Sequence, residues 1–331
     1  MEKTLKALVV GSGDMGEKHA RAYQRLPNVD LCAVADPDGL RAGRMAAELN
    51  VQGVYAGFQE AIEQERPDIV SVCVPAFLHA GISAAALEQG CHVLCEKPLA
   101  LTLEDARRML DAAEKSNAHL AVVFQRRFMP VWQEVEQRLP ALGAPLSYQA
   151  ADFRPVRPKV LMHSKSGNGG PVIDCCVHDF NMVLHLFGKP ASVYAMGDVY
   201  ADGKSEVDSV RDLAVDTAAI SIRFEAGHKA LVSYCWGLPT GYEDSVRAEI
   251  LGPNGLLRIF PDSLEHHLPG GRVETVRGLE EEGHPAQIAA FVDAIAGGQT
   301  PPVNPGEALP ALEVACAALA SIESGAAEPL G

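Results

Sequence analysis

Hydrophobic residues in the first part of the chain form short continuous runs that are bounded by Gly, Pro or Asp. These runs are Leu5–Val10, Asp30–Ala35, Ile69–Val74, His92–Cys95 and His119–Phe124. Such runs are typical of parallel strands that are buried on both faces. Helical patterns separate them, at Met15–Leu26, Leu40–Leu49, Ile82–Gln89 and Leu103–Ser116. This alternation predicts βαβ units and a parallel sheet.

The pattern changes after Phe124. One helix is predicted at Val131–Leu139, and longer strand-like runs follow at Leu146–Phe153, Ser192–Tyr200, Thr217–Phe224, Lys229–Cys235, Val246–Leu251 and Leu256–Phe260. Residues 225–228 (EAGH) and 252–255 (GPNG) indicate hairpin turns, and sequential hairpins make an antiparallel sheet. Terminal helices are predicted at Ala286–Ala296 and Glu307–Ser324. We therefore expect an α/β domain over residues 1–124 and an α+β domain over 125–331.

Composition and charge narrow the function. The 331 residues carry a formal charge of −15, which argues against a grip on nucleic acid or anionic membrane through a basic face. The apolar stretch Ala308–Ile322 is interrupted by Pro310 and Glu313, and is shorter than the ~20 residues that a membrane span needs. The N-terminal residues show no secretory signal, so a cytoplasmic protein is expected.

The eight cysteines do not form a disulfide or metal pattern. Cys32 and Cys73 lie in apolar runs, where a thiol acts as a small hydrophobic group. The spacings Cys91/Cys95 and Cys175/Cys176 do not repeat as zinc pairs do, so no metal site is expected.

A glycine motif follows the first predicted strand. The residues are Gly11, Ser12, Gly13, Asp14, Met15 and Gly16, which fit G-x-G-x-x-G and open a predicted helix. In this pattern the glycines permit a tight turn, close approach to a pyrophosphate and close packing of helix on strand. The helix N-terminus supplies N–H donors and a positive dipole. The motif predicts a dinucleotide site, and the alternative is a glycine turn without a nucleotide.

The acidic residue at the end of the second strand bears on cofactor choice. Asp36 lies 20 residues after Gly16, where a carboxylate accepts hydrogen bonds from the adenosine ribose and repels a 2′-phosphate. This favours NAD over NADP. Arg41 and Arg44 follow closely and keep NADP open as the alternative.

Two further segments carry candidate chemistry. Lys97 follows the strand at His92–Cys95, and the carboxyl ends of parallel strands face the ligand crevice. A lysine there stabilises a developing alkoxide, although a solvated charge is the plainer alternative. Residues 167–170 form a glycine loop, and a helix over Pro171–Phe187 would place Asp174 and His178 four apart on one face. A carboxylate beside an imidazole is a proton-transfer pair, or an ordinary surface pair.

These motifs together resemble the Gfo/Idh/MocA oxidoreductase family over nearly the whole chain. The resemblance rests on GSGDMG, Asp36, the EKP sequence at 96–98 and Asp174-x3-His178, with residues 75–79 (PAFLH) and the HPAQIAAFVDAI run beginning at His284. It implies a Rossmann domain followed by an α+β domain with a large open, mainly antiparallel sheet, and assembly as a homodimer or homotetramer. It also implies that Pro75, His79 and Glu96 contact the cofactor.

The same resemblance implies catalytic roles. Lys97, Asp174 and His178 match the catalytic triad of the inositol dehydrogenase branch, with His178 as general acid/base, Lys97 polarising the reacting oxygen, and Asp174 orienting substrate or base. Two positions depart from the family: Ala76 stands where many relatives have Asn or Thr, and Asn181 where many have Asp. Neither departure touches the triad.

Polar and aromatic residues elsewhere are candidates for substrate contact. Basic residues before the glycine loop either bind a polyhydroxylated or acidic substrate or form a solvated loop. Aromatic residues either pack on a sugar ring or belong to the core. The candidates are Arg127, Arg154, His163, Trp236 and His284.

The leading hypothesis is therefore an NAD-dependent dehydrogenase acting on a secondary alcohol of an inositol or sugar-like polyol. A reductase of keto-sugars or small carbonyl compounds is the alternative within the enzyme class. A non-catalytic NAD-bound sensor or regulator is the alternative outside it.

Overall fold

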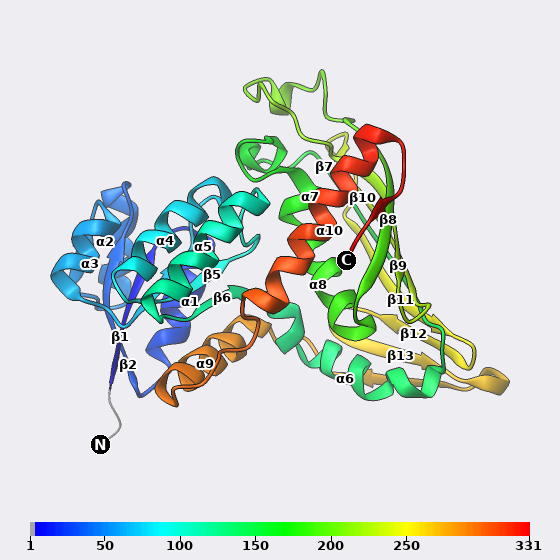
Figure 1. The fold of residues 1–331 in the computed structure, drawn as a ribbon, viewed down its shortest axis with the longest axis horizontal. Coiled ribbons are helices and arrows are strands. Elements are labelled where there is room, and N and C mark those ends of the chain that lie inside the picture. The colour runs from blue at the N-terminus through cyan, green and yellow to red at the C-terminus, as the bar shows by residue number, and fades with distance from the viewer. Residues whose placement is uncertain (1–3) are drawn as a thin grey trace. The chain divides into compact units, whose positions relative to one another are not determined.

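The chain folds into two compact units. The computed structural model describes residues 4–331. The first unit contains residues up to 125 together with 282–309, and the second contains 126–281 together with 310–331 (Figure 1). The sequence pattern alone places everything after residue 124 in one domain, and it does not reveal that residues 282–309 pack with the first unit.

The first unit is built on a six-stranded parallel sheet, and the five continuous apolar runs correspond to five of its strands. The strand order is β3-β2-β1-β4-β5-β6, so the order reverses direction between β1 and β4. The strands are β1 (Leu5–Val10), β2 (Val29–Ala35), β3 (Gly53–Tyr55), β4 (Ile69–Val72), β5 (His92–Glu96) and β6 (Leu120–Val123). In a sheet of this order, dinucleotides bind outside the carboxyl ends of the strands at the reversal.

Six helices accompany this sheet. They are α1 (Asp14–Gln24), α2 (Gly39–Glu48), α3 (Phe58–Glu65), α4 (His79–Glu88), α5 (Leu103–Ser116) and α9 (Gly283–Ala296). The limits of β1 and α5 agree with the prediction to the residue. Neither β3 nor α3 is among the predicted elements. A three-residue edge strand that begins at Gly53 presents no apolar run.

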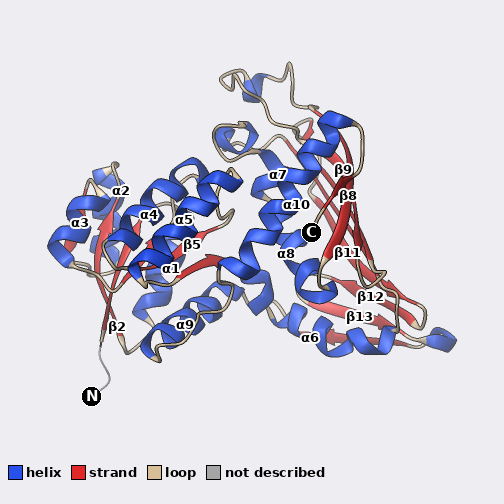
Figure 2. Cartoon of the chain, viewed as in Figure 1, coloured by secondary structure: helices blue, strands red, loops and turns tan. Residues whose placement is uncertain are grey.

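The second unit contains a nine-stranded, mainly antiparallel sheet (Figure 2). Its order is β14-β13-β12-β11-β7-β10-β9-β8-β15. Among the described strands of this sheet, only β7 and β10 pair in parallel. The strands are β7 (Ser147–Pro155), β8 (Pro190–Asp198), β9 (Thr217–Phe224), β10 (Lys229–Leu238), β11 (Ser245–Gly252), β12 (Gly255–Ile259), β13 (Ser263–His267), β14 (Val273–Arg277) and β15 (Glu328–Pro329). Both predicted hairpins, β9–β10 and β11–β12, are confirmed.

The helix predicted at Pro171–Phe187 is wrong as a single element. It is two helices, α7 (Gly170–Asp174) and α8 (Cys176–Phe187), which meet at Cys175 with φ −116° and ψ −47°. The Cys175 N–H still bonds to the Pro171 carbonyl, but the His178 N–H bonds to the Cys175 carbonyl, three residues back. Position 175 is neither Gly nor Pro, so no local signal marks the break.

Two other helices lie wholly or partly in the second unit, α6 (Pro130–Arg138) and α10 (Pro305–Ser324). Within residues 4–331, α10 alone has the length and apolar composition to cross a membrane. A core helix of a globular protein passes the same test, so this is weak evidence.

The core of the first unit joins segments from both ends of the chain. Ile288, Phe291 and Val292 of α9 are buried in one cluster with Val9 of β1 and Leu94 of β5. The apolar face of α9 is therefore covered by this core, which explains why the chain returns to the first unit.

Truncation of Phe291 tests this arrangement. Phe291→Ala leaves a cavity in the core, and we expect the free energy of unfolding of the first unit to fall by about 3–5 kcal/mol in urea titrations. Leu40→Ala, at a residue that is 90% exposed, is the matched control and should change it by less than ~0.5 kcal/mol. A loss below about 1 kcal/mol for Phe291→Ala would show that α9 is not part of this core.

Candidate active site

The glycine motif lies between β1 and α1, and its three glycines have different environments. Gly11 has φ +98°, and a Cβ there would lie 2.2 Å from the Cys73 carbonyl oxygen. A Cβ on Gly16 would lie 1.8 Å from the Gly11 carbonyl oxygen. Around Gly13, none of the described atoms outside its own neighbours lies within 4 Å of such a Cβ. Packing therefore explains Gly11 and Gly16, whereas Gly13 leaves open space.

That space lies at the start of α1. Gly13 is the N-cap residue, and it has no side chain with which to cap this helix terminus. Backbone N–H groups at such a terminus are ready donors for a pyrophosphate. Asp14 and Met15 begin the helix, with Asp14 exposed and Met15 half-buried. The residues present therefore fit a dinucleotide.

Asp36 is held at the end of β2 by the same loop. Its Oδ2 accepts hydrogen bonds from the Ser12 backbone N–H at 2.7 Å and from the Ser12 hydroxyl at 2.8 Å. Its Oδ1 accepts one from the Asp38 N–H at 2.8 Å. Burial raises the pKa of Asp36, but these hydrogen bonds outweigh it and leave the pKa below its usual value. The residue is a fixed carboxylate beside the glycine loop.

His79 links two strand ends. Its Nδ1 lies 2.7 Å from the Pro98 carbonyl oxygen and its Nε2 lies 3.0 Å from the Val74 carbonyl oxygen. Burial lowers its pKa, and the two carbonyl contacts offset this only in part. Both ring nitrogens are thus engaged by the backbone around Pro75 and Pro98, so this side chain shapes the edge of the sheet. Contact of Pro75 and His79 with a cofactor stays a prediction.

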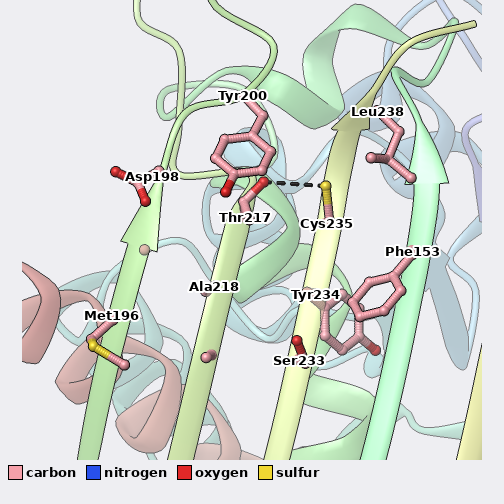
Figure 3. A pocket seen from close by; sticks show the side chains of 12 residues that line it. Phe153, Met196, Asp198, Tyr200, Thr217, Ala218, Ser233, Tyr234, Cys235 and Leu238 are labelled. Atoms are coloured by element: carbon pink, nitrogen blue, oxygen red, sulfur yellow. Dashed lines mark hydrogen bonds between the residues drawn. The ribbon is translucent and has the colours of Figure 1, made fainter.

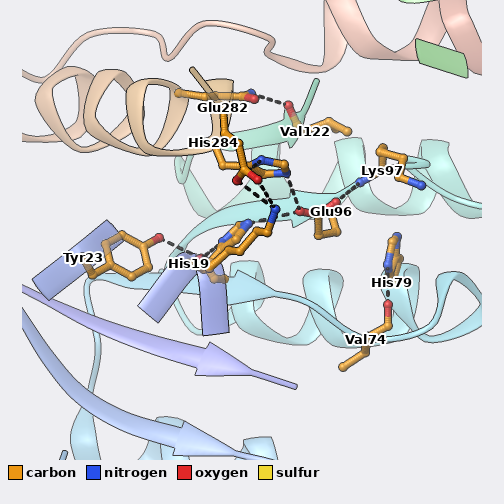
Figure 4. A network of polar contacts seen from close by, with 12 residues as sticks. His19, Tyr23, Val74, His79, Glu96, Lys97, Val122, Glu282 and His284 are labelled. Carbon is orange, nitrogen blue, oxygen red and sulfur yellow. Dashed lines mark hydrogen bonds and ion pairs between the residues drawn. The ribbon is translucent and has the colours of Figure 1, made fainter. Parts of the chain in front are cut away.

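Glu96 ends β5 and lies in a buried polar network (Figure 4). His19 Nε2 is 3.2 Å and His284 Nε2 is 4.0 Å from Glu96 Oε1. The Lys97 backbone N–H donates to Glu96 Oε2 at 3.3 Å. Burial raises the pKa of Glu96, yet the hydrogen bond and charge of His19, followed by His284 and Lys97, bring it below its usual value. An ionised carboxylate thus lies immediately before Lys97.

The network continues on both sides of Glu96. His19 Nδ1 contacts the Ser71 hydroxyl at 2.9 Å, and the Tyr23 hydroxyl contacts the same atom at 2.8 Å. On the other side, Glu282 lies 4.0 Å from His284 and 2.8 Å from Lys18. His284, which was predicted as a substrate contact, therefore belongs to the first unit and packs beside Glu96. The peptide bond between Lys97 and Pro98 is cis.

Asp174 and His178 lie in the second unit on either side of the helix break. Asp174 ends α7 and His178 is in the first turn of α8, and both side chains are buried. The expectation of one continuous helix through both residues is wrong, because the helix is interrupted at Cys175. That the two side chains face the same way stays a prediction. Gly170, the first residue of α7, has φ +76°, and a Cβ there would lie 2.4 Å from the Cβ of Ala214, so the start of α7 packs closely against the segment at Ala214.

Asp179 is a buried residue of this region that no motif in the sequence identifies. Its buried carboxylate accepts hydrogen bonds from Arg126, Tyr148 and Tyr234. These donors lie 53, 31 and 55 residues away in the chain, so no local spacing signals the cluster. Only the pairing of β7 with β10 brings the two tyrosines together.

The remaining substrate candidates lie in the second unit. Arg127 is half-buried in a 3₁₀ turn over Gln125–Phe128. Arg154 is bound to Asp152, and its Nη1 lies 2.8 Å from Asp244. His163 Nε2 accepts the Arg157 backbone N–H at 2.9 Å. The Trp236 ring lies 5.9 Å below the Arg157 guanidinium. Their role toward a substrate stays a prediction.

A hollow of about 430 Å³ lies over strands β7 to β10 (Figure 3). Phe153, Met196, Tyr200 and Leu238 give it apolar walls. Within the described chain, Lys97, Asp174 and His178 are not among its lining residues. No group of three or more metal-ligating side chains occurs among residues 4–331.

Comparison with known proteins places the chain in a family. Residues 5–124 match the oxidoreductase family, NAD-binding Rossmann fold, and residues 140–330 match its C-terminal alpha/beta domain. The chain belongs to the Gfo/Idh/MocA oxidoreductase family. The predicted fold class is confirmed, and so is the prediction of NAD, because the matched family model is that of an NAD-binding Rossmann fold.

Named relatives are similar over nearly their full length. The chain is 28% identical to scyllo-inositol 2-dehydrogenase (NAD(+)) of Bacillus subtilis, covering 98% of this chain and 96% of that one. It is 28% identical to myo-inositol 2-dehydrogenase of Thermotoga maritima, covering 95% of each. The structure of levoglucosan dehydrogenase in complex with NADH has the same fold, with a TM-score of 0.88 at 21% identity over 99% of each chain.

The contrast between Gly13 and Gly16 is testable. Gly13→Ala should leave the melting temperature within ~2 °C of wild type, yet weaken NADH binding at least ~10-fold, because the methyl group enters the space beside the pyrophosphate. Gly16→Ala should instead destabilise the fold, because its Cβ meets the Gly11 carbonyl. Fluorescence titration with NADH and thermal unfolding separate the two effects. If Gly13→Ala binds NADH with wild-type affinity, the assignment of this space to the pyrophosphate is refuted.

Proposed function

We propose that the protein is a cytoplasmic, NAD-dependent dehydrogenase that oxidises a secondary alcohol of an inositol or sugar-like polyol. The observation that carries this proposal is the placement of Lys97. It follows β5 at the carboxyl edge of the parallel sheet, the edge that also carries the glycine loop after β1 and Asp36 after β2. A lysine beside a dinucleotide site is well suited to act on the oxygen of a reacting alcohol.

Roles for the side chains follow from their chemistry. Bound NAD supplies the acceptor for the hydride that leaves the alcohol carbon. His178 takes the hydroxyl proton as general base, because a neutral imidazole accepts a proton near neutral pH. Lys97 donates a hydrogen bond to the developing alkoxide, and Asp174 orients the substrate or His178. Glu96 is ionised and buried immediately before Lys97, and the charge of Lys97 is one of the causes that lower the Glu96 pKa.

The arginines of the second unit bear on whether the substrate is neutral or acidic. Arg154 and Arg157 share the carboxylate of Asp244, and Arg154 also binds Asp152. Their charges are therefore balanced within the protein, which supports a neutral polyol over a sugar acid. The inositol dehydrogenases among the relatives support the same substrate class.

Two other functions are weaker. A reductase of keto-sugars or small carbonyl compounds would use the same residues in the opposite direction. A sensor that binds NAD without turnover has no need of a lysine, an aspartate and a histidine of catalytic type, all of which this chain retains.

A substrate screen tests the function. Inositols, neutral sugars and sugar acids are incubated with NAD or with NADP, and absorbance at the wavelength of the reduced cofactor is followed. We expect reduction of NAD by a neutral polyol. Activity with NADP alone would refute the role given to Asp36, and binding of NADH without any turnover would support the sensor.

Substitution of the proposed catalytic residues tests the mechanism. Lys97→Ala and His178→Gln should each lower kcat by about 100-fold or more, because each removes a group that acts on the reacting hydroxyl. NADH binding, measured by fluorescence, should stay within about threefold of wild type in His178→Gln. Near-wild-type turnover in Lys97→Ala would refute the mechanism.

We also propose that the protein is a homodimer or homotetramer that assembles through the open face of its large sheet. Apolar side chains Tyr194 and Met196 of β8 and Leu231 of β10 are exposed on this sheet. An exposed apolar patch of this kind marks an interaction surface, since water contact with it is unfavourable.

A charge placed on this surface tests the assembly. Met196 is 59% exposed, so Met196→Glu should not disturb the fold, but it should shift the molecular mass in light scattering toward a smaller species. Leu40→Glu, on the surface of the other unit, is the control and should leave the mass unchanged. An unchanged mass for Met196→Glu would argue for a different interface.

A further inference from the structure

Asp179 directly follows the proposed general base, and the mechanism above does not use it. Its side chain is only 4% exposed. Oδ1 accepts hydrogen bonds from Arg126 Nη1 at 2.8 Å and from the Tyr148 hydroxyl, and Oδ2 accepts one from the Tyr234 hydroxyl at 2.5 Å. These donors come from three elements of the second unit: the 3₁₀ turn at Gln125–Phe128, β7 and β10.

The charges and protonation states of this cluster strengthen the contacts that its members make with Asp179. A buried carboxylate is tolerated only where donors or an opposite charge replace water, and Arg126 supplies that charge. Burial raises the pKa of Tyr148 and Tyr234, and the charge of Asp179 raises it further, so both phenols stay protonated and donate. Burial lowers the pKa of Arg126, but Asp179 more than offsets this and keeps the guanidinium charged.

The cluster acts where the helix is interrupted. Because α7 ends at Asp174 and the backbone turns at Cys175, the first turn of α8 is not fixed by a continuous helix before it. Asp179 is in that turn. Tyr148 pairs with Ala230, so Tyr234 lies four residues further along the neighbouring strand and on the same face of the sheet. Because one carboxylate binds both tyrosines, the position of the first turn of α8 is fixed both along the strands and across them.

We propose that Asp179 is the positioning residue for His178: by binding Arg126, Tyr148 and Tyr234 it holds the first turn of α8, and with it the imidazole, in the place that catalysis requires. This inference rests on the proposed function. Asp179 itself contacts neither substrate nor cofactor in this assignment. Its effect is on geometry, and a displacement of a catalytic group by about 1 Å can cost 100-fold in rate.

The main test is Asp179→Asn in the full-length protein. The amide keeps the shape of the side chain, but it has one acceptor oxygen for three donors. We expect kcat to fall by about 100-fold while KM for NAD stays within about twofold, because the cofactor loop belongs to the other unit. A folded variant with kcat within about twofold of wild type would overturn the proposal.

Ser321→Ala is the matched control for a purely structural loss. The Ser321 hydroxyl is fully buried in the same unit, accepts the Ala195 N–H at 2.9 Å and donates to the Ala326 carbonyl at 2.6 Å. This variant should lower the melting temperature without changing kcat. An equal fall in kcat for Ser321→Ala would show that kcat follows general stability, and would overturn the assignment to Asp179.

Tyr148→Phe and Tyr234→Phe keep the test decisive if Asp179→Asn does not fold. Each removes one donor to Asp179 and leaves its ion pair with Arg126 in place. Each should lower kcat by about three- to tenfold at unchanged KM for NAD, since one hydrogen bond to a charged group is lost. Wild-type kcat in both variants would overturn the proposal.

A measurement without turnover separates this proposal from the proposed function. Histidine ring resonances are recorded by NMR on the protein, and the His178 signal is identified by its loss in His178→Gln. Asp179→Asn, or Tyr234→Phe, should shift this signal, and Ser321→Ala should not. If the wild-type protein oxidises no polyol, the proposed function fails, and the His178 signal still decides: an unchanged signal in the Asp179 and Tyr234 variants refutes the positioning role.

Discussion

The burial of a carboxylate beside each proposed reacting group is the constraint on which the rest of the structure depends. Glu96 precedes Lys97 in the first unit, and Asp179 follows His178 in the second. Both side chains are buried. Taking a charge out of water costs several kcal/mol, and this cost is offset only when partners stay in good geometry. Each carboxylate therefore requires a specific arrangement of the elements around it.

The partners of these carboxylates come from distant parts of the chain. His19 lies in α1 and His284 in α9, so Glu96 ties the start of the cofactor-binding unit to the segment that returns to it. Asp179 ties α8 to β7, β10 and the turn at Gln125–Phe128. Removing one partner of a buried ion pair costs about 3–5 kcal/mol, so neither group moves freely. Stability and the placement of the reacting residues thus depend on the same contacts.

The sequence predicts those features that depend on local pattern. Continuous apolar runs identify five of the six strands of the parallel sheet, all except β3, and the turn at 225–228 identifies the β9–β10 hairpin. The glycine motif and Asp36 are recognisable because the site lies within one βαβ unit. The features that it does not predict are tertiary: the break at Cys175, the return of α9, and the cluster at Asp179. Arg154 is a similar case, since only the fold shows that its charge is balanced by Asp152 and Asp244.

The acidity of the chain is compatible with an anionic cofactor, because the donors for a phosphate are backbone groups. At a net charge of −15 the surface as a whole does not attract phosphate. The start of α1 offers backbone N–H groups instead, and these can donate to a phosphate without any basic side chain. Glu17, in the first turn of this helix, is paired with Arg21 at 2.6 Å, which reduces its repulsion of a phosphate. Binding of a pyrophosphate here therefore requires the space at Gly13 and the amides at the start of α1, and it does not require a basic surface.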